Sequence, residues 1–242
     1  MTRALRSAIG VLCVCLMADG VEARCADLAL VLAIDGSGSI DEGEFALQQS
    51  GYANAFRSDR VQAALNGAGT VDIAVVLWGD SAIPVQVLPW QRLDRAAGAG
   101  QLAQMIEAAP RRVNGNTSIG TGLWAALDLL DDPVRCADRS VINVSGDGVE
   151  SLGPRPDSVI PLEKARARAM ASGVTINALA ISGGSERLVD WFRQSVATGP
   201  DSFVMQVSFF SDFGDAIAEK LAREIRAPAL AANQLSPGQA SR

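Results

Sequence analysis

Histidine is absent from the 242 residues of the chain. It is the base of Ser-His-Asp triads and a ligand of the common zinc sites, so those sites are excluded and most hydrolase hypotheses are removed with them. Lysine and arginine total 21 against 27 aspartates and glutamates, which gives a formal net charge of −6. Without a basic surplus to neutralise phosphates, nucleic acid is not expected as a partner.

Long apolar runs are also missing, apart from a short one near the N-terminus. Two arginines precede an apolar segment from Ala8 to Ala18, and small residues follow as a cleavage signature. This order is typical of a secretory signal peptide, which we place at residues 1–23. No segment approaches the roughly 20 apolar residues of a membrane span, so no span is expected after cleavage. A retained signal anchor is the alternative, and the residues before Cys25 suit a lipoprotein poorly.

Cysteine is scarce, with four residues in the chain. Cys13 and Cys15 would leave with the signal peptide, so the mature protein would hold Cys25 and Cys136. In the oxidising periplasm or outside the cell, two cysteines indicate one disulfide. Two unpaired buried cysteines are the alternative.

Aromatic residues make up 5% of the chain, whereas 48% is apolar, enough for one domain with a core. Apolar runs of strand length lie at 26–34, 71–79, 83–89, 139–147, 174–181 and 202–207. Helical patterns begin at about Glu42 and then cover about 95–108, 118–132, 160–172, 185–197 and 211–226. The alternation predicts an α/β fold, a doubly wound and mostly parallel six-stranded sheet with helices on both faces. The prolines of 83–89 suit a short antiparallel edge strand.

The expected domain spans residues 24–226. Beyond it, residues 227–242 are small, contain proline and show no periodic apolar face. We expect this tail to be disordered.

Small oxygen-bearing residues follow the first expected strand. In VLAIDGSGSI (31–40) the apolar run stops at Asp35, and Ser37 and Ser39 follow at two-residue spacings. The glycines between them permit tight backbone geometry, so a carboxylate and two hydroxyls could converge where parallel α/β sheets bind ligands. The pattern indicates a cation site, with a capped helix start as the alternative. A phosphate-binding GxGxxG loop fails because Asp41 occupies the last glycine position.

Two later segments carry the same kind of residue. Thr117 in GNTSIGTGL (115–123) precedes an amphipathic helix and offers a third hydroxyl. Asp147 in VINVSGDGVE (141–150) ends another apolar strand and is followed by glycine. Taken singly, a threonine N-cap and an Asp-Gly turn would account for them.

The combination of DxSxS, GxTxxG and an apolar strand ending in Asp-Gly resembles the von Willebrand factor A domain with its metal-ion-dependent adhesion site. The resemblance covers about residues 26–226 and implies the fold expected above. It also implies five metal ligands, bound directly or through water: Asp35, Ser37, Ser39, Thr117 and Asp147.

The implied ligands are all oxygens, which favours Mg²⁺, with Mn²⁺ or Ca²⁺ as alternatives, over zinc or copper. Neutral hydroxyls leave the ion enough positive character to attract a further carboxylate. The resemblance therefore implies a binding module for an Asp or Glu carboxylate on a protein or peptide, and not an enzyme. The alternative is a hydrolase assisted by the same ion.

The segments EFALQQSGYANAF, VLWGD, INVSGDG and FGDAIAEKLAREI look most like a group of bacterial secreted single-domain proteins of unknown function. This favours a periplasmic or secreted protein of a Gram-negative bacterium, and we expect a monomer. Gly146 departs from the threonine that is frequent before the last aspartate. Four residues after expected strands are candidates for the rim of the site or, alternatively, solvated surface: Asp80, Glu150, Arg155 and Ser185.

In the family that this chain resembles, the first and fourth strands are parallel neighbours. Cys25 precedes Asp35 by ten residues, and Cys136 precedes Asp147 by eleven. The resemblance therefore implies that both thiols lie at the end of the sheet opposite the metal, within reach of a Cys25–Cys136 disulfide.

Overall fold

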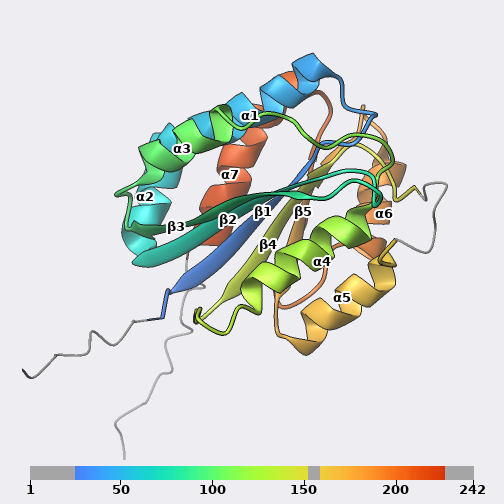
Figure 1. The fold of residues 1–242 in the computed structure, drawn as a ribbon. Helices are drawn as coiled ribbons and strands as arrows, with labels where there is room; N and C mark the ends of the chain where they lie inside the picture. The colour runs from blue at the N-terminus through green and yellow to red at the C-terminus, as the bar shows by residue number, and fades with distance from the viewer. Residues whose placement is uncertain (1–24, 152–158, 227–242) are drawn as a thin grey trace, which may run out of the picture.

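A computed structural model describes residues 25–151 and 159–226 as one six-stranded sheet covered by helices (Figure 1). The strands are β1 (Leu28–Asp35), β2 (Thr70–Trp78), β3 (Gln86–Asp94), β4 (Ser140–Gly146), β5 (Thr175–Ile181) and β6 (Val204–Val207). The helices are α1 (Glu42–Arg57), α2 (Asp59–Ala68), α3 (Ala99–Glu107), α4 (Ile119–Leu130), α5 (Leu162–Ala171), α6 (Glu186–Ser195) and α7 (Phe213–Ile225). The predictions for residues 1–23, Arg155 and residues 227–242 lie outside the described residues.

The strand order is β3-β2-β1-β4-β5-β6, with β3 antiparallel and the other five strands parallel. The winding direction reverses at β1, because the chain goes from β1 outward to β2 on one side and continues from β4 on the other. Ligands of such sheets bind beyond the carboxyl ends of the strands at this reversal. The predicted fold class is confirmed.

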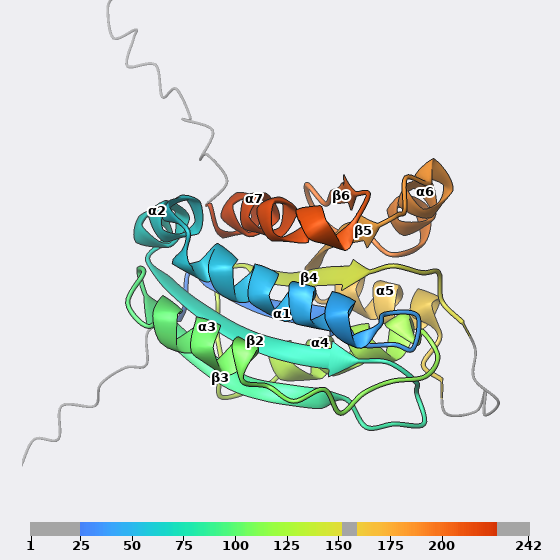
Figure 2. The ribbon, with the colours of Figure 1, turned by 90° about the horizontal axis from the view of Figure 1, so that it is seen from above.

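Alternation along β1 divides the core into two parts. Leu30 and Leu32 face the core beneath α1, α2, α3 and α7, whereas Val31 and Ala33 face the core beneath α4, α5 and α6. Figures 1 and 2 show these two helical layers, with α1 and α7 side by side on one face. Every residue of β1 is buried. A strand buried on both faces reads as a continuous apolar run, and so the polar residue at its end stands out in the sequence.

Two elements differ from their predictions. The edge strand β3 begins and ends later than 83–89 and is nine residues long. It contains a bulge, since Ile73 pairs with Gln91 and Val75 with Leu88, so that three steps along β3 match two along β2. Pro89 lies in this bulge, where its missing N–H costs no ladder hydrogen bond.

The other difference is α2, which the sequence pattern did not separate from the helix beginning at Glu42. Ser58 has an extended backbone (φ −71°, ψ 145°) that ends α1. Its hydroxyl accepts the Val61 N–H and so begins α2. A residue that caps two helices in succession replaces one long helix by two.

The disulfide Cys25–Cys136 lies at the amino ends of β1 and β4 and is confirmed by a Cα–Cα distance of 4.7 Å. Beside it the backbones pair through two hydrogen bonds, Ala26 N–H to the Cys136 carbonyl and Asp138 N–H to the Ala26 carbonyl, both 2.9 Å. The bond is typical of extracytoplasmic proteins. Among the described helices, none is long and apolar enough to cross a membrane.

Replacing both cysteines by alanine is expected to lower the free energy of unfolding by about 2–5 kcal/mol, because the bond restrains a long loop in the unfolded chain. Urea denaturation measures the loss. Dithiothreitol should destabilise the wild type to the same degree and leave the Cys25→Ala/Cys136→Ala variant unchanged. Alkylation of two free thiols in the non-reduced mature protein would contradict the bond.

Candidate metal centre

The loop between β1 and α1 is held in place through its backbone. Gly36 N–H donates to the Trp78 carbonyl at 2.8 Å and Gly38 N–H to the Gly115 carbonyl at 2.7 Å, which ties the loop to β2 and to the loop before α4. A Cβ at Gly36 would lie 2.5 Å from Val113 Cγ2, so only glycine fits there. A capping box at Asp41 then begins α1.

The five side chains predicted to bind a metal converge at the carboxyl ends of β1 and β4. Ser37 N–H donates to Asp35 Oδ1 at 2.7 Å, and Ser37 Oγ lies 3.3 Å from Ser39 Oγ. Ser39 Oγ donates to Asp147 Oδ1 at 2.7 Å, and Thr117 Oγ1 donates to Ser37 Oγ at 3.3 Å. The structure thus brings two carboxylates and three hydroxyls from three loops into one contiguous set.

The set runs from the core to the surface. Asp35 and Ser37 are fully buried and Thr117 is nearly so, whereas Asp147 is partly exposed and Ser39 is exposed. Groups at the bottom can therefore hold an ion while those at the top remain accessible to a partner.

One carboxylate oxygen of Asp35 lacks a hydrogen-bond partner among the described residues. Its Oδ2 atom is buried and accepts no hydrogen bond in the described part of the chain. Burial raises the pKa of the Asp35 carboxyl to about 7, against the lowering effect of the Ser37 N–H, and the Asp147 carboxylate raises it further. Burial also raises the pKa of Asp147, which Ser39 partly offsets. Within residues 25–151 and 159–226 neither carboxylate forms an ion pair, so the two together form a site that a cation would stabilise.

The oxygen chemistry of this set suits a hard cation such as Mg²⁺. Nowhere in residues 25–151 and 159–226 do three or more Asp, Glu, Cys or His side chains gather as a metal cluster. Any cation at the convergent set would therefore depend on hydroxyls for part of its coordination.

Gly146, which replaces the threonine frequent in the resembled family, lies close to Asp35. A Cβ at Gly146 would lie 3.1 Å from Asp35 Oδ2 and 3.4 Å from Phe192 Cζ. A side chain here would require the Asp35 carboxylate to shift by a few tenths of an ångström. The glycine leaves the unpartnered oxygen free of a steric contact from β4.

Arg111 supports the loop and was missed by the sequence analysis. Its Nη2 donates to the carbonyls of Gly36, Ser37 and Ile40 at 3.1, 2.8 and 2.9 Å. Its guanidinium also lies 5.1 Å from the centre of the Phe45 ring. No local signal identified it, because its partners are backbone carbonyls that only the folded loop presents.

Thr117 is fixed by a reciprocal pair of bonds with Ser151. Thr117 N–H donates to Ser151 Oγ at 2.9 Å, and Ser151 N–H donates to the Thr117 carbonyl at 3.0 Å. Asp80, a predicted rim residue, supports the same loop by accepting the Asn116 side-chain amide at 2.6 Å. Bonds from the backbone N–H of Ala82 and from Asn116 lower the pKa of Asp80. Asp80 therefore positions a loop.

The other predicted rim residues in the described chain have different surroundings. Glu150 accepts the Gly120 N–H at 3.0 Å and so caps α4, whose preceding Ser118 supplies no side-chain cap. Burial raises the pKa of Glu150. Ser185 precedes α6 and makes no side-chain cap bond.

Behind the site, the Asp35 carbonyl joins a buried polar chain. Gln48 Nε2 donates to it at 3.1 Å, and Ser145 Oγ donates to Gln48 Oε1 at 3.4 Å. Tyr52 OH continues the chain, because it lies 3.3 Å from Ser145 Oγ and 3.0 Å from Asn143 Oδ1. Side chains of α1 and β4 are thus bonded to each other beneath the loop, which fixes the height of Asp35 above the core.

Solved structures with this fold include von Willebrand factor A domains and pilus proteins. The pilus adhesin SpaC of Lactobacillus rhamnosus GG is 17% identical with a TM-score of 0.59, over 83% of this chain and 30% of that one. A von Willebrand factor type A protein of Catenulispora acidiphila is 16% identical with a TM-score of 0.55, over 83% and 43%. The vWF domain of Mfa5, a type V pili tip protein of Porphyromonas gingivalis, is 16% identical with a TM-score of 0.53, over 85% and 98%. Identities this low establish the fold alone.

The search of curated proteins found no match. A family profile described as "Protein of unknown function (DUF1194)" matches residues 24–229, which is most of the chain. The description of this profile assigns no function. The chain is a member of the DUF1194 family and has the fold of a von Willebrand factor A domain.

Proposed function

We propose that this protein is a divalent-metal-dependent binding module that recognises an Asp or Glu carboxylate on a protein or peptide. The observation that carries the proposal is the buried, unpartnered Oδ2 of Asp35 beside four other oxygen-bearing side chains. Buried polar atoms without partners are rare in native proteins, and a bound cation would satisfy this one.

Mg²⁺ is the proposed ion, with Mn²⁺ or Ca²⁺ as alternatives. Asp35, Asp147, Ser37, Ser39 and Thr117 would hold it directly or through water. Mg²⁺ keeps an octahedral shell and retains several waters, so an exchangeable position would remain for a partner's carboxylate. Exposed Ser39 and partly exposed Asp147 mark the side from which that carboxylate would approach.

The fold neighbours support a binding role. A pilus adhesin and a pilus tip protein share this architecture. The disulfide and the secretory signal expected at residues 1–23 support a periplasmic or secreted protein of a bacterium. The proposed partner is therefore a protein or peptide outside the cytoplasm.

The alternative is a metal-assisted hydrolase, which would need a base to activate water. The chain contains no histidine. Glu150 is engaged by the Gly120 N–H, and buried Lys220 pairs with Glu224 at 2.6 Å. The proposal consequently assigns no catalytic residue.

Mg²⁺ should bind with one ion per chain and stabilise the protein by about 2.7 kcal/mol at a hundred times its dissociation constant. Calorimetry and thermal unfolding measure the two effects. Asp147→Asn is expected to abolish most of the response, whereas Asp138→Asn, the same change at the opposite edge of the sheet, should retain it. Equal responses of the two variants, or a preference for Zn²⁺, would refute the site.

Without divalent ions, the free energy of unfolding should fall as the pH rises from about 4 to about 7. The raised pKa of Asp35 means that the folded state holds this proton more tightly than the unfolded state. The stability it contributes is full below the unfolded pKa and lost as the pH rises through the folded pKa, on the order of 4 kcal/mol in all. Urea denaturation of the wild type and Asp35→Asn across this range measures the difference. Identical pH profiles would show that Asp35 does not titrate in this way.

Immobilised wild-type protein should capture its partner from a bacterial extract in Mg²⁺ and release it in EDTA. Free glutamate at high concentration should compete, because the proposed contact is a carboxylate. Asp147→Asn should lose the captured protein and Asp138→Asn should keep it, as judged by mass spectrometry. Capture that is unaffected by EDTA and by Asp147→Asn would contradict metal-dependent recognition. Metal-dependent turnover abolished by Asp35→Asn would instead favour the hydrolase.

A further inference from the structure

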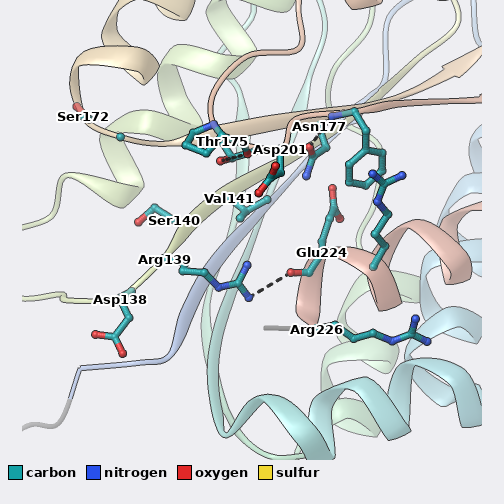
Figure 3. Close-up of a pocket in the computed structure, with 15 residues that line it drawn as sticks. Asp138, Arg139, Ser140, Val141, Ser172, Thr175, Asn177, Asp201, Glu224 and Arg226 are labelled. Atoms are coloured by element: carbon teal, nitrogen blue, oxygen red, sulfur yellow. Dashed lines mark hydrogen bonds between the residues drawn. The ribbon is translucent and has the colours of Figure 1, made fainter. Parts of the chain in front are cut away.

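A cavity of about 410 Å³ lies at the amino ends of the strands, at the opposite end of the sheet from the metal centre. It is bounded by the segments leading into β4, β5 and β6 and by the last turn of α7 (Figure 3). Strand β4 begins at this cavity with Ser140 and ends next to Asp147, so a distance of about 20 Å along the strand separates the two places. The cavity is distinct from the candidate metal centre, and its volume is typical of a small-molecule site.

Three arginines line this cavity: Arg139, Arg223 and Arg226. None of them forms an ion pair with a carboxylate of residues 25–151 or 159–226. The Arg223 guanidinium stacks on the Phe203 ring, 3.7 Å from its centre. Arg226, just after α7, is exposed. The cavity therefore carries several guanidiniums that form no ion pair with the described carboxylates, although Asp138, Asp201 and Glu224 also belong to its lining.

Arg139 is the partly buried member of this group. Its Nη2 donates to the carbonyls of Glu224 and Ile225 at the end of α7, both at 3.3 Å. Figure 3 shows the bond to Glu224. Burial lowers the pKa of Arg139, because carbonyl dipoles replace the lost water only in part. The rest of its planar fork has the geometry that binds carboxylate or phosphate through two parallel hydrogen bonds.

The carboxylate of Glu224, whose carbonyl accepts from Arg139, already has two other hydrogen-bond partners. The Glu224 carboxylate accepts Lys220 Nζ and Asn143 Nδ2, each at 2.6 Å. Asp201 belongs to the loop that Thr175 Oγ1 holds through the Pro200 carbonyl, and Figure 3 shows it across the cavity from Arg226. Asp138, directly before Arg139, also lines the cavity, and neither it nor Asp201 forms an ion pair with the arginines among the described residues.

Neutral donors complete the lining. Asn177 Oδ1 accepts the Phe203 N–H at 3.0 Å, which leaves the Asn177 amide N–H groups as donors. Ser140 adds a hydroxyl at the start of β4. Donors of this kind orient a small anion once the guanidiniums have attracted it.

We propose that this cavity binds a small oxyanion, a carboxylate or phosphate compound, through Arg139 and Arg226 with Asn177 and Ser140 as neutral donors. The site is independent of the metal centre and of the proposed partner. Its ligand would be a solute of the compartment in which the protein resides.

Binding is tested on metal-free protein prepared with a chelating resin, because EDTA itself carries carboxylates. Citrate and inorganic phosphate are titrated separately against chloride at equal ionic strength, and calorimetry measures affinity. At least one should bind at millimolar concentration, and the pair distinguishes a carboxylate from a phosphate site. Amide resonances of Thr175 and Asn177 should shift in NMR spectra, while those of Ser37 and Ser39 should not.

Arg226→Gln is the decisive variant, since this exposed side chain forms no hydrogen bond or ion pair with the described residues. It should weaken anion binding by about tenfold, the effect of losing one charged hydrogen bond. Arg187→Gln, the same change on exposed α6, should leave affinity unchanged, as should Asp147→Asn at the metal centre. The proposal is overturned if neither anion binds, if Arg226→Gln binds as tightly as Arg187→Gln, or if the shifted resonances lie elsewhere.

Discussion

The parallel pairing of β1 with β4 determines which side chains meet at the two ends of these strands. At their carboxyl ends the two strands deliver Asp35 and Asp147 to one place, and at their amino ends they bring Cys25 to Cys136. The chain leaves β1 for α1 on one face and β4 for α5 on the other, so none of the described helices covers the junction. The disulfide at the amino ends and the pair of carboxylates at the carboxyl ends follow from the same register.

Neither carboxylate forms an ion pair with a cation of the described residues. Arg111 lies beneath the loop, and its guanidinium donates to three backbone carbonyls. It therefore fixes the loop and forms no ion pair with Asp35 or Asp147. Burying unpaired carboxylates in an apolar setting costs free energy unless a cation supplies the opposite charge. The hydroxyls of Ser37, Ser39 and Thr117 add coordination without adding negative charge.

The convergent side chains could be predicted because each follows a strand or begins a helix at a recognisable break in an apolar pattern. Asp35 and Asp147 end buried strands, and the topology of parallel sheets then places them together. Arg111 was missed and Asp80 was predicted only as a rim residue, because the partners of both belong to loops distant in sequence. The bounds of β3 were predicted wrongly for a related reason. The bulge at Pro89 depends on pairing with β2 and not on the composition of β3.

The staple between β1 and β4 also has a mechanical consequence. Tension applied along the strand axes at the carboxyl ends of β1 and β4 would reach the amino ends, where Cys25 meets Cys136. If one strand alone carried this tension, its hydrogen bonds to the other strand would be loaded together, in shear. Because the disulfide joins the two strands at the base, tension entering through either aspartate would be shared by both.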